Sequence, residues 1–285
     1  MAYATGQITL SNTPRADLLV QVETLLTTHT AWSFVEEHVD GSWTFRIWKN
    51  SGLENSWGQD FYIAFGLLSS NETLYCFTFE VWDDVGKLGI RGCPNRTSNL
   101  TPEETYASYG GDTGYPLSNS TAFGQVTQAT NTTDFDWYCL VTKDVCIVNV
   151  DTSNNFLYNG LFESFVTDHP QEFPITSSSV TLGSCSRRPA MGGTYMTNAF
   201  NLTFGFWTQA EGTVPTGMPL HGNKSLGART VVIHGTGTGG LYRGLLYHVL
   251  RFNTDAAVEV GDTITVGNVT YVYADAQYWL DTTAD

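Results

Sequence analysis

Trp43-Thr-Phe45-Arg-Ile47-Trp48 is the stretch of sequence that decides the fold. Its large aromatic and β-branched side chains occupy alternate positions, which is the pattern of a strand with one buried face. Two stretches of the same kind follow at 61–65 and 74–82. Because turn-forming residues separate the three stretches, we predict an antiparallel meander.

An amphipathic helix is predicted before the meander, over 14–28. Thr13-Pro14 is typical of an N-cap residue followed by proline at the first helical position. Apolar residues then recur at helical spacing, namely Leu18, Leu19, Val22, Leu25 and Leu26. This apolar face needs a partner, and the adjacent aromatic sheet is the nearest candidate. A short strand is predicted ahead of the helix, at 7–10.

The second half of the chain is also predicted to be rich in strands. A hairpin is expected over 137–150 with its turn at Lys143-Asp144, and Gly267-Asn268 is a tight hairpin signal. A short helix is expected over 158–166, ended by Pro170. Further strands are predicted at 200–207, 230–233, 241–252, 263–266 and 269–273. The expected fold is therefore mainly β with a few helices (α+β), with antiparallel sheets or a sandwich and an N-terminal helix packed on a sheet.

The domain organisation is predicted from a change in composition. Residues 1–93 would hold the helix and the meander, and residues 135–285 a second β-rich lobe. Between them, residues 94–134 are rich in Asn, Thr, Ser and Gly and predict a polar loop or arm, with one helical turn capped at 101–104. The two lobes could also form one continuous domain.

Composition excludes several classes of partner. Charged residues make up only 14% of the 285 residues, yet the formal net charge is −15. Thirteen Lys and Arg residues in the whole chain are too few and too scattered for a nucleic-acid surface. The apolar runs are far too short to cross a membrane. Residues 1–6 show no secretion signal, so synthesis in a cytosol is expected.

No metal, cofactor or catalytic residue is predicted. The cysteines and histidines are not spaced as metal ligands, and reduced cysteines acting as small apolar residues are expected. No G-x-S-x-G turn is present, and the glycine-rich stretch at 235–240 is expected to be a hairpin tip, because a strand signal follows it and no Lys does. The residues weighed were Cys76, Cys93, Cys139, Cys146, Cys185 beside Arg187 and Arg188, His29, His38, His169, His221, His234, His248, and the carboxylate pairs Asp83 with Asp84, Glu103 with Glu104, and Asp134 with Asp136.

Two other features have competing interpretations. Trp57 lies in the polar connection 49–60, where a tryptophan either plugs the local core or meets a partner. The sequons at Asn71, Asn95, Asn99, Asn131, Asn201 and Asn268 would accept glycans only on a secretory route, so they are interpreted as part of a Thr- and Asn-rich surface.

Several motifs resemble those of virion structural proteins of tailed bacteriophages. The opening is similar to phage tail and neck proteins at 43–49, at Gly58-x-Asp60-Phe61-Tyr62 and at Phe79-Glu-x-Trp82-Asp. The closing stretches Tyr242-Arg243-Gly244 and 261–271 look like the C-terminal part of those proteins. The motifs are loose and carry over no site residue.

The resemblance implies an assembly function in a virion tail or neck. The chain would be a structural component, made in the host cytoplasm, that joins copies of itself and other virion proteins in a collar, terminator or tube-associated ring. An open sheet edge could accept a neighbour's strand. An acidic inner wall would let DNA slide past without binding. The alternative is a carbohydrate- or receptor-binding module of the tail tip, for which exposed Trp57, Trp207 and Trp279 would supply the platform.

Overall fold

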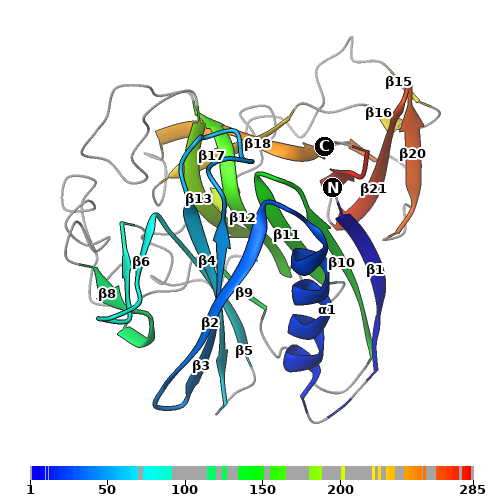
Figure 1. Cartoon of the computed structure of the whole chain (residues 1–285). Helices are drawn as coiled ribbons and strands as arrows, with labels where there is room; N and C mark the ends of the chain where they lie inside the picture. Colours follow the sequence, from blue (N-terminus) through cyan, green and yellow to red (C-terminus); the bar gives the residue numbers. More distant parts are fainter. Residues whose placement is uncertain are drawn as a thin grey trace.

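The aromatic stretch forms a five-stranded antiparallel sheet in the computed structural model (Figure 1). Its strands lie in the order β2 (Trp32–Asp40), β3 (Trp43–Asn50), β4 (Phe61–Leu68), β5 (Thr73–Phe79) and β9 (Gly124–Val126). The structure describes residues 2–9, 11, 13–69, 73–91, 114–119, 124–126, 134–150, 155–164, 180–187, 200–202, 220–221, 224–225, 229–234, 241–251, 253–254, 261–275 and 278–283. Strands β3, β4 and β5 confirm the predicted meander.

Helix α1 (Pro14–Thr28) has the predicted bounds. Its apolar face is buried through Leu18, Leu19, Val22 and Leu26. Thr13 holds the N-cap position and its carbonyl accepts the N–H of Asp17, but its side chain makes no capping bond. No helix in the described part of the chain has the length and apolar character that a bilayer crossing requires.

A second, larger sheet contains eleven strands. Its order is β1 (Ala2–Ile8), β10 (Phe135–Val141), β11 (Val145–Val150), β12 (Asn155–Ser164), β13 (Val180–Arg187), β14 (Phe200–Leu202), β17 (Arg229–His234), β18 (Leu241–Arg251), β22 (Tyr278–Asp281), β21 (Val269–Asp275) and β20 (Thr263–Val266). All neighbours are antiparallel except β13 and β14. The 137–150 and Gly267-Asn268 hairpins are confirmed.

Strand β12 also pairs with β18. The five strands β12, β13, β14, β17 and β18 therefore form a closed circle of paired neighbours within the sheet. Gly160 marks the point where β12 leaves β11 and continues towards β18. Its φ is +136°, and a side chain there would place Cβ 2.3 Å from the carbonyl oxygen of Asp144. Only glycine fits this close crossing.

Short elements complete the described fold. Strands β6 (Val81–Asp83), β7 (Leu88–Ile90) and β8 (Tyr115–Pro116) form a small sheet, followed by the 3-10 helix η1 (Leu117–Asn119). Strands β15 (Leu220–His221), β16 (Lys224–Ser225) and β19 (Asn253–Thr254) form another. The prediction of a mainly β fold with antiparallel sheets and an N-terminal helix packed on a sheet is therefore confirmed.

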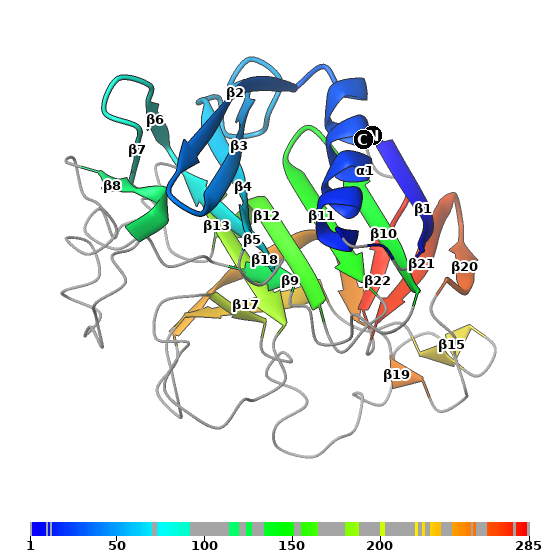
Figure 2. The same ribbon diagram turned by 90° about the horizontal axis from the view of Figure 1, so that it is seen from below.

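The main core lies between the helix and the two large sheets, and α1 sits between the meander and strands β1 and β10 (Figures 1 and 2). Trp48, Phe61 and Phe65 contribute from the meander, and Trp137 and Val148 from the eleven-stranded sheet. The opposite face of the meander is buried in a second cluster, which includes Trp43, Phe45, Phe77, Phe79 and Trp82. Both faces of the meander are therefore packed, so the prediction of a single buried face is wrong.

Three of the predicted elements differ from the structure. The helix expected over 158–166 is wrong, because 155–164 form strand β12. Leu157, Tyr158, Leu161 and Phe162 are all buried, and an apolar run buried on both faces fits helical spacing by chance. The first strand lies at 2–8 instead of 7–10, and Trp82 belongs to β6 instead of the third meander strand.

The three predicted regions are connected in the structure. Strand β1, from the first region, pairs along its whole length with β10, from the last. The main core draws residues from both. Within 94–134 the structure describes residues 114–119, with β8 and η1, residues 124–126 of β9, and residue 134. The capped turn expected at 101–104 lies outside the described residues.

Candidate interaction surface

Strand β2 forms an open edge of the five-stranded sheet. It pairs with β3 on one side, and no strand among the described residues pairs with the other. Three apolar side chains on it are exposed: Phe34 by 43%, Val35 by 38% and Val39 by 61%. A two-residue turn at Gly41-Ser42 joins β2 to β3, with Gly41 at φ +60° as such tight turns require. We call residues 33–40 the β2 edge.

The register with β3 assigns each side chain of the β2 edge to one face. Phe34 lies opposite Trp48, Glu37 opposite Arg46 and Val39 opposite Thr44, on the face that carries helix α1. On the other face, Glu36 lies opposite Ile47, His38 opposite Phe45 and Asp40 opposite Trp43. Val35 is the extra residue of a bulge between Phe34 and Glu36.

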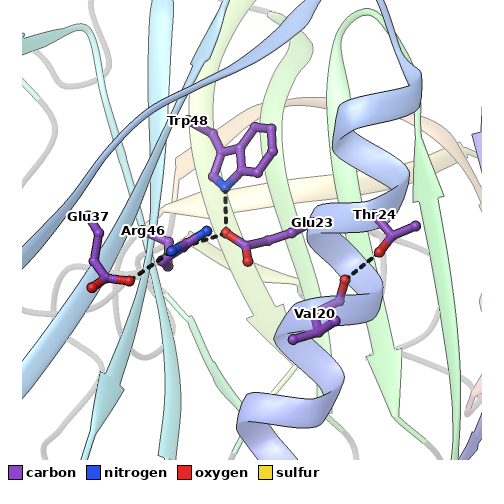
Figure 3. Close-up of polar contacts among 6 residues, drawn as sticks. All are labelled: Val20, Glu23, Thr24, Glu37, Arg46 and Trp48. Atoms are coloured by element: carbon purple, nitrogen blue, oxygen red, sulfur yellow. Dashed lines mark hydrogen bonds and ion pairs between the residues drawn. The ribbon is translucent and has the colours of Figure 1, made fainter.

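A network of ion pairs fixes the helix-side face (Figure 3). Arg46 donates Nε–H to Glu23 of α1 at 2.8 Å and Nη1–H to Glu37 of the β2 edge at 2.7 Å. The indole N–H of Trp48 donates to the same Glu23 oxygen at 3.1 Å. The guanidinium also stacks over Phe34, 4.4 Å from the ring centre. The exposed Phe34 side chain is therefore held in place, because its neighbours are tied to the helix.

Electrostatics favour this arrangement. Burial alone would lower the pKa of Arg46, but hydrogen bonds and charge attraction from Glu23 and Glu37 outweigh it and raise the pKa above its ordinary value. The guanidinium is fully charged at any physiological pH. Arg46 therefore remains the cationic member of this network across the physiological range.

Separate contacts fix the other face of the β2 edge. The carboxylate of Glu36 accepts hydrogen bonds from Lys87 at 2.6 Å and from the indole N–H of Trp82 at 2.6 Å. Burial alone would raise the pKa of Glu36, but the bonds from Lys87 and Trp82 outweigh it and lower the pKa. His38 lies between the rings of Phe45 and Trp82, and Asp40 accepts a short hydrogen bond from the Ser118 hydroxyl.

The connection between β3 and β4 is held by hydrogen bonds of its own and by bonds to the β10–β11 turn. The Asn55 side chain accepts the backbone N–H groups of Trp57 and Gly58, both at 2.9 Å, and donates to Asn50 at 2.7 Å and to the Gln59 carbonyl at 2.8 Å. Trp57 is half-buried and packs against the main core, which favours the plug interpretation over the partner one.

Further bonds join this loop region to the second sheet. The Asp144 carboxylate accepts the backbone N–H of Ser56 at 2.6 Å and its hydroxyl at 2.8 Å. Asn50 donates to the Lys143 carbonyl at 2.9 Å, and the indole N–H of Trp32 donates to the Thr142 carbonyl at 2.7 Å. The two sheets are thus joined by polar contacts as well as by the apolar core.

Of the described residues weighed for chemistry, Cys139 and Cys146 lie next to each other in the main core. Cys76, Cys139 and Cys146 are buried and reduced. Burial, followed by the neighbouring Cys146 thiol, raises the pKa of Cys139 well above its usual range. Cys139 and Cys146 face the same core on adjacent strands, at a diagonal offset. Within the described residues, no group of three His, Cys, Asp or Glu side chains could hold a metal ion.

The other weighed residues are dispersed along the fold. Asp83 ends β6, where it accepts the N–H groups of Val85 and Gly86, and Asp136 lies on β10. Cys185 is on β13, and His234 and Leu241 pair on either side of the glycine-rich stretch, with a strand after it. Cys93, Glu103, Glu104, His169, Arg188 and 235–240 lie outside the described residues.

The tryptophans expected to form a sugar platform are only partly described. Trp279 is fully buried and Trp57 packs against its own core, whereas Trp207 lies outside the described residues. Sequence reasoning missed the β2 edge as a site. The available signal was a run that mixes aromatic and β-branched residues with acidic ones, Ser33-Phe-Val-Glu-Glu-His-Val-Asp40, followed by a two-residue turn and the first aromatic strand. No protein-family model matches the sequence, and no curated protein is significantly similar to it.

Proposed function

We propose that this chain is an assembly protein whose copies associate through the β2 edge, and that it serves as a structural component of a tailed-phage virion, in a ring of the tail or neck. The observation that carries the proposal is the open β2 edge, with exposed Phe34, Val35 and Val39. Long unpaired edges with exposed apolar side chains template pairing with another chain. The placement in a virion rests on the resemblance of the sequence motifs.

The backbone supplies the means of association. The carbonyl of Ser42 accepts the N–H of Ser69 from beyond β4, so the backbone groups of Trp43 point towards β2. Antiparallel ladders alternate, so Val39 and Glu37 direct their N–H and C=O groups away from β3. A strand from another chain would satisfy these groups, and the exposed Val39 side chain would pack against it.

The side chains around the edge favour association without rearrangement. Glu23, Arg46 and Lys87 hold the two faces of the strand from the helix and from the β6–β7 hairpin. A preorganised edge loses less conformational entropy when it is paired. A rigid block presenting one prepared strand is a suitable unit for a ring.

The proposal is tested by blocking the backbone of the edge. V39P removes an N–H that faces away from β3, so the internal ladder remains intact. Size-exclusion chromatography with light scattering should show wild type as an oligomer and V39P as a monomer, with matching circular dichroism. The control V39T should assemble like wild type.

Two outcomes would contradict the proposal. One is a wild-type chain that stays monomeric at millimolar concentration, and the other is a folded V39P variant that assembles as wild type does. If V39P does not fold, V39K replaces it, because a lysine directed along an edge strand also opposes strand addition.

A further inference from the structure

A second open edge on the same molecule is formed by β1. This strand pairs only with β10, and no described strand covers its other side. It is seven residues long and contains no charged residue, in the sequence Ala2-Tyr-Ala-Thr-Gly-Gln-Ile8. Strands β1 and β2 lie on opposite sides of helix α1 (Figures 1 and 2).

We infer that the β1 edge of one copy pairs with the β2 edge of the next, so that copies join head to tail. This inference rests on the proposed function, since it names the partner of the β2 edge. A contact between two different edges is heterologous, and repeated rotation by such a contact gives a closed ring or a filament.

Pairing of β2 with β2 of another copy is disfavoured by charge. Glu36, Glu37 and Asp40 lie within five residues of one another. Antiparallel self-pairing centred on residue 37 would place Glu37 opposite Glu37, and pairing centred on residue 38 would place Glu36 opposite Asp40. Like charges directly opposite one another on paired strands are destabilising. Each copy also carries a net charge of −15, so the favoured contact is one that adds no further acid.

The outward backbone groups of β1 follow from the hydrogen bonds of its neighbour. The Thr142 N–H donates to the Val145 carbonyl at 2.9 Å, so this pair closes the β10–β11 turn. Successive residues of a strand direct their N–H and C=O groups to opposite neighbours. Because Thr142 faces β11, the backbone groups of Trp137, Cys139 and Val141 face β1. Their partners on β1 are Gly6, Ala4 and Ala2. The backbone groups that face away from β10 are therefore those of Tyr3, Thr5 and Gln7.

An antiparallel ladder between the edges would place outward-facing residues opposite one another. Glu37 and Val39 of one copy would then lie against members of the set Tyr3, Thr5 and Gln7 of the next. The Tyr3 hydroxyl and the second N–H of the Gln7 amide can donate to the Glu37 carboxylate, whereas the Thr5 hydroxyl already donates to the Trp137 carbonyl. An aromatic or β-branched neighbour suits Val39. Burial, followed by the neighbouring Tyr138, raises the pKa of Tyr3 to about 12, so its hydroxyl stays a donor.

The remaining positions of the two edges are also compatible. The same registers place Glu36, His38 and Asp40 opposite the alternate positions of β1, which include Ala2, Ala4 and Gly6. These small residues leave room for the larger side chains of β2 and their existing partners Lys87, Trp82 and Ser118. The pairing therefore requires neither a buried like-charge contact nor loss of the bonds that hold the β2 edge.

The inference is tested by blocking each edge separately and then mixing the two variants. T5P removes an outward N–H of β1, and V39P an outward N–H of β2. Each variant alone should be monomeric by native mass spectrometry. An equimolar mixture should give a one-to-one heterodimer and nothing larger, because β1 of V39P can still pair with β2 of T5P. T5V, which loses the hydroxyl bond to the Trp137 carbonyl but keeps the N–H, is the control and should assemble.

The outcomes separate this inference from the proposed function. If T5P alone assembles as wild type does while V39P is monomeric, the β1 edge is not the partner and the inference fails, although assembly through β2 stands. A monomeric wild type instead contradicts the proposed function. If T5P does not fold, Q7P replaces it, because the N–H of Gln7 faces the same way.

Discussion

Asn55 is the residue on which the loop between β3 and β4 depends. Its buried amide makes four hydrogen bonds within the loop and to Asn50. N55A should lower the free energy of unfolding by about 2 to 3 kcal/mol, because buried donors and acceptors are left without partners. Urea denaturation measures the change. L53A alters a side chain that is 96% exposed in the same loop, and it should stay within about 0.5 kcal/mol of wild type.

One outcome would contradict this role of Asn55. If N55A and L53A have similar small effects, the loop is held mainly by its fastening to Asp144 and by Trp57 packing. The sequence predicted an irregular connection here and left the role of Trp57 open. It could not predict the fastening, since Asp144 lies 88 residues from Ser56 along the chain.

Glu36 makes the stability of the β2 edge depend on pH. Its pKa is lowered from 4.5, so the folded state binds fewer protons than the unfolded state around and below that pH. The stabilisation is full above pH 4.5 and is lost as the pH falls through the lower, folded-state pKa. At pH 7, wild type should exceed E36Q by less than about 1 kcal/mol, because the ion pair is partly exposed.

Thermal unfolding of both proteins, measured from about pH 3 to about pH 7, checks this expectation, because that range covers the usual pKa values of carboxyl groups. The difference between wild type and E36Q should shrink towards the acidic end. E54Q removes one charge from an exposed position and controls for the change in net charge. A difference that grows as the pH falls would count against the ion pair with Lys87.

At the scale of elements, helix α1 is stabilised by burial of one face. Leu18 is fully buried between the two sheets, whereas Val20, two residues on, is 56% exposed. L18A should cost about 2 to 5 kcal/mol through lost burial and the cavity left behind. V20A should change stability by less than about 0.5 kcal/mol. Equal effects in urea denaturation would mean that the helix is held mainly by Glu23 and its partners.

Sequence patterns predicted the elements whose side chains follow a regular period. Helix α1 buries one stripe, and Trp43, Phe45 and Ile47 of β3 alternate with half-buried residues, so 3.6-residue and two-residue periods identified them. Strand β12 was predicted as a helix, because its buried positions 157–162 show no alternation. Strand β2 was not predicted at all. Its status as an open edge depends on which strands pair elsewhere, and no local pattern carries that information.

At the scale of the whole molecule, the net charge should govern assembly. Copies that each carry −15 repel one another, and the proposed contact between β1 and β2 contains no compensating ion pair. Salt screens this repulsion, since the Debye length falls from about 10 Å at 0.1 M to about 3 Å at 1 M. The assembled fraction should therefore rise between low and high sodium chloride in sedimentation velocity experiments.

The opposite salt dependence would indicate a different contact. Dissociation at high salt would mean that cations such as Lys87 or Arg46 leave their internal partners to bind a neighbour. The salt in this experiment should be sodium chloride or potassium chloride. Guanidinium chloride is unsuitable, because it also unfolds the chain.

The pairing of β1 with β10 has a consequence for biosynthesis. Strand β1 can pair with β10 only after β10 has left the ribosome, because Ile8 pairs with Phe135 and Ala2 with Val141. At about 5 to 20 residues per second, this delay is on the order of ten seconds. During this delay β1 is an uncharged strand without its partner, while 43–79 can already close by local contacts and cover part of the apolar face of α1. During refolding, pulsed hydrogen exchange should likewise show protection of 43–79 before 2–8, because the meander pairs strands that are near one another in the sequence.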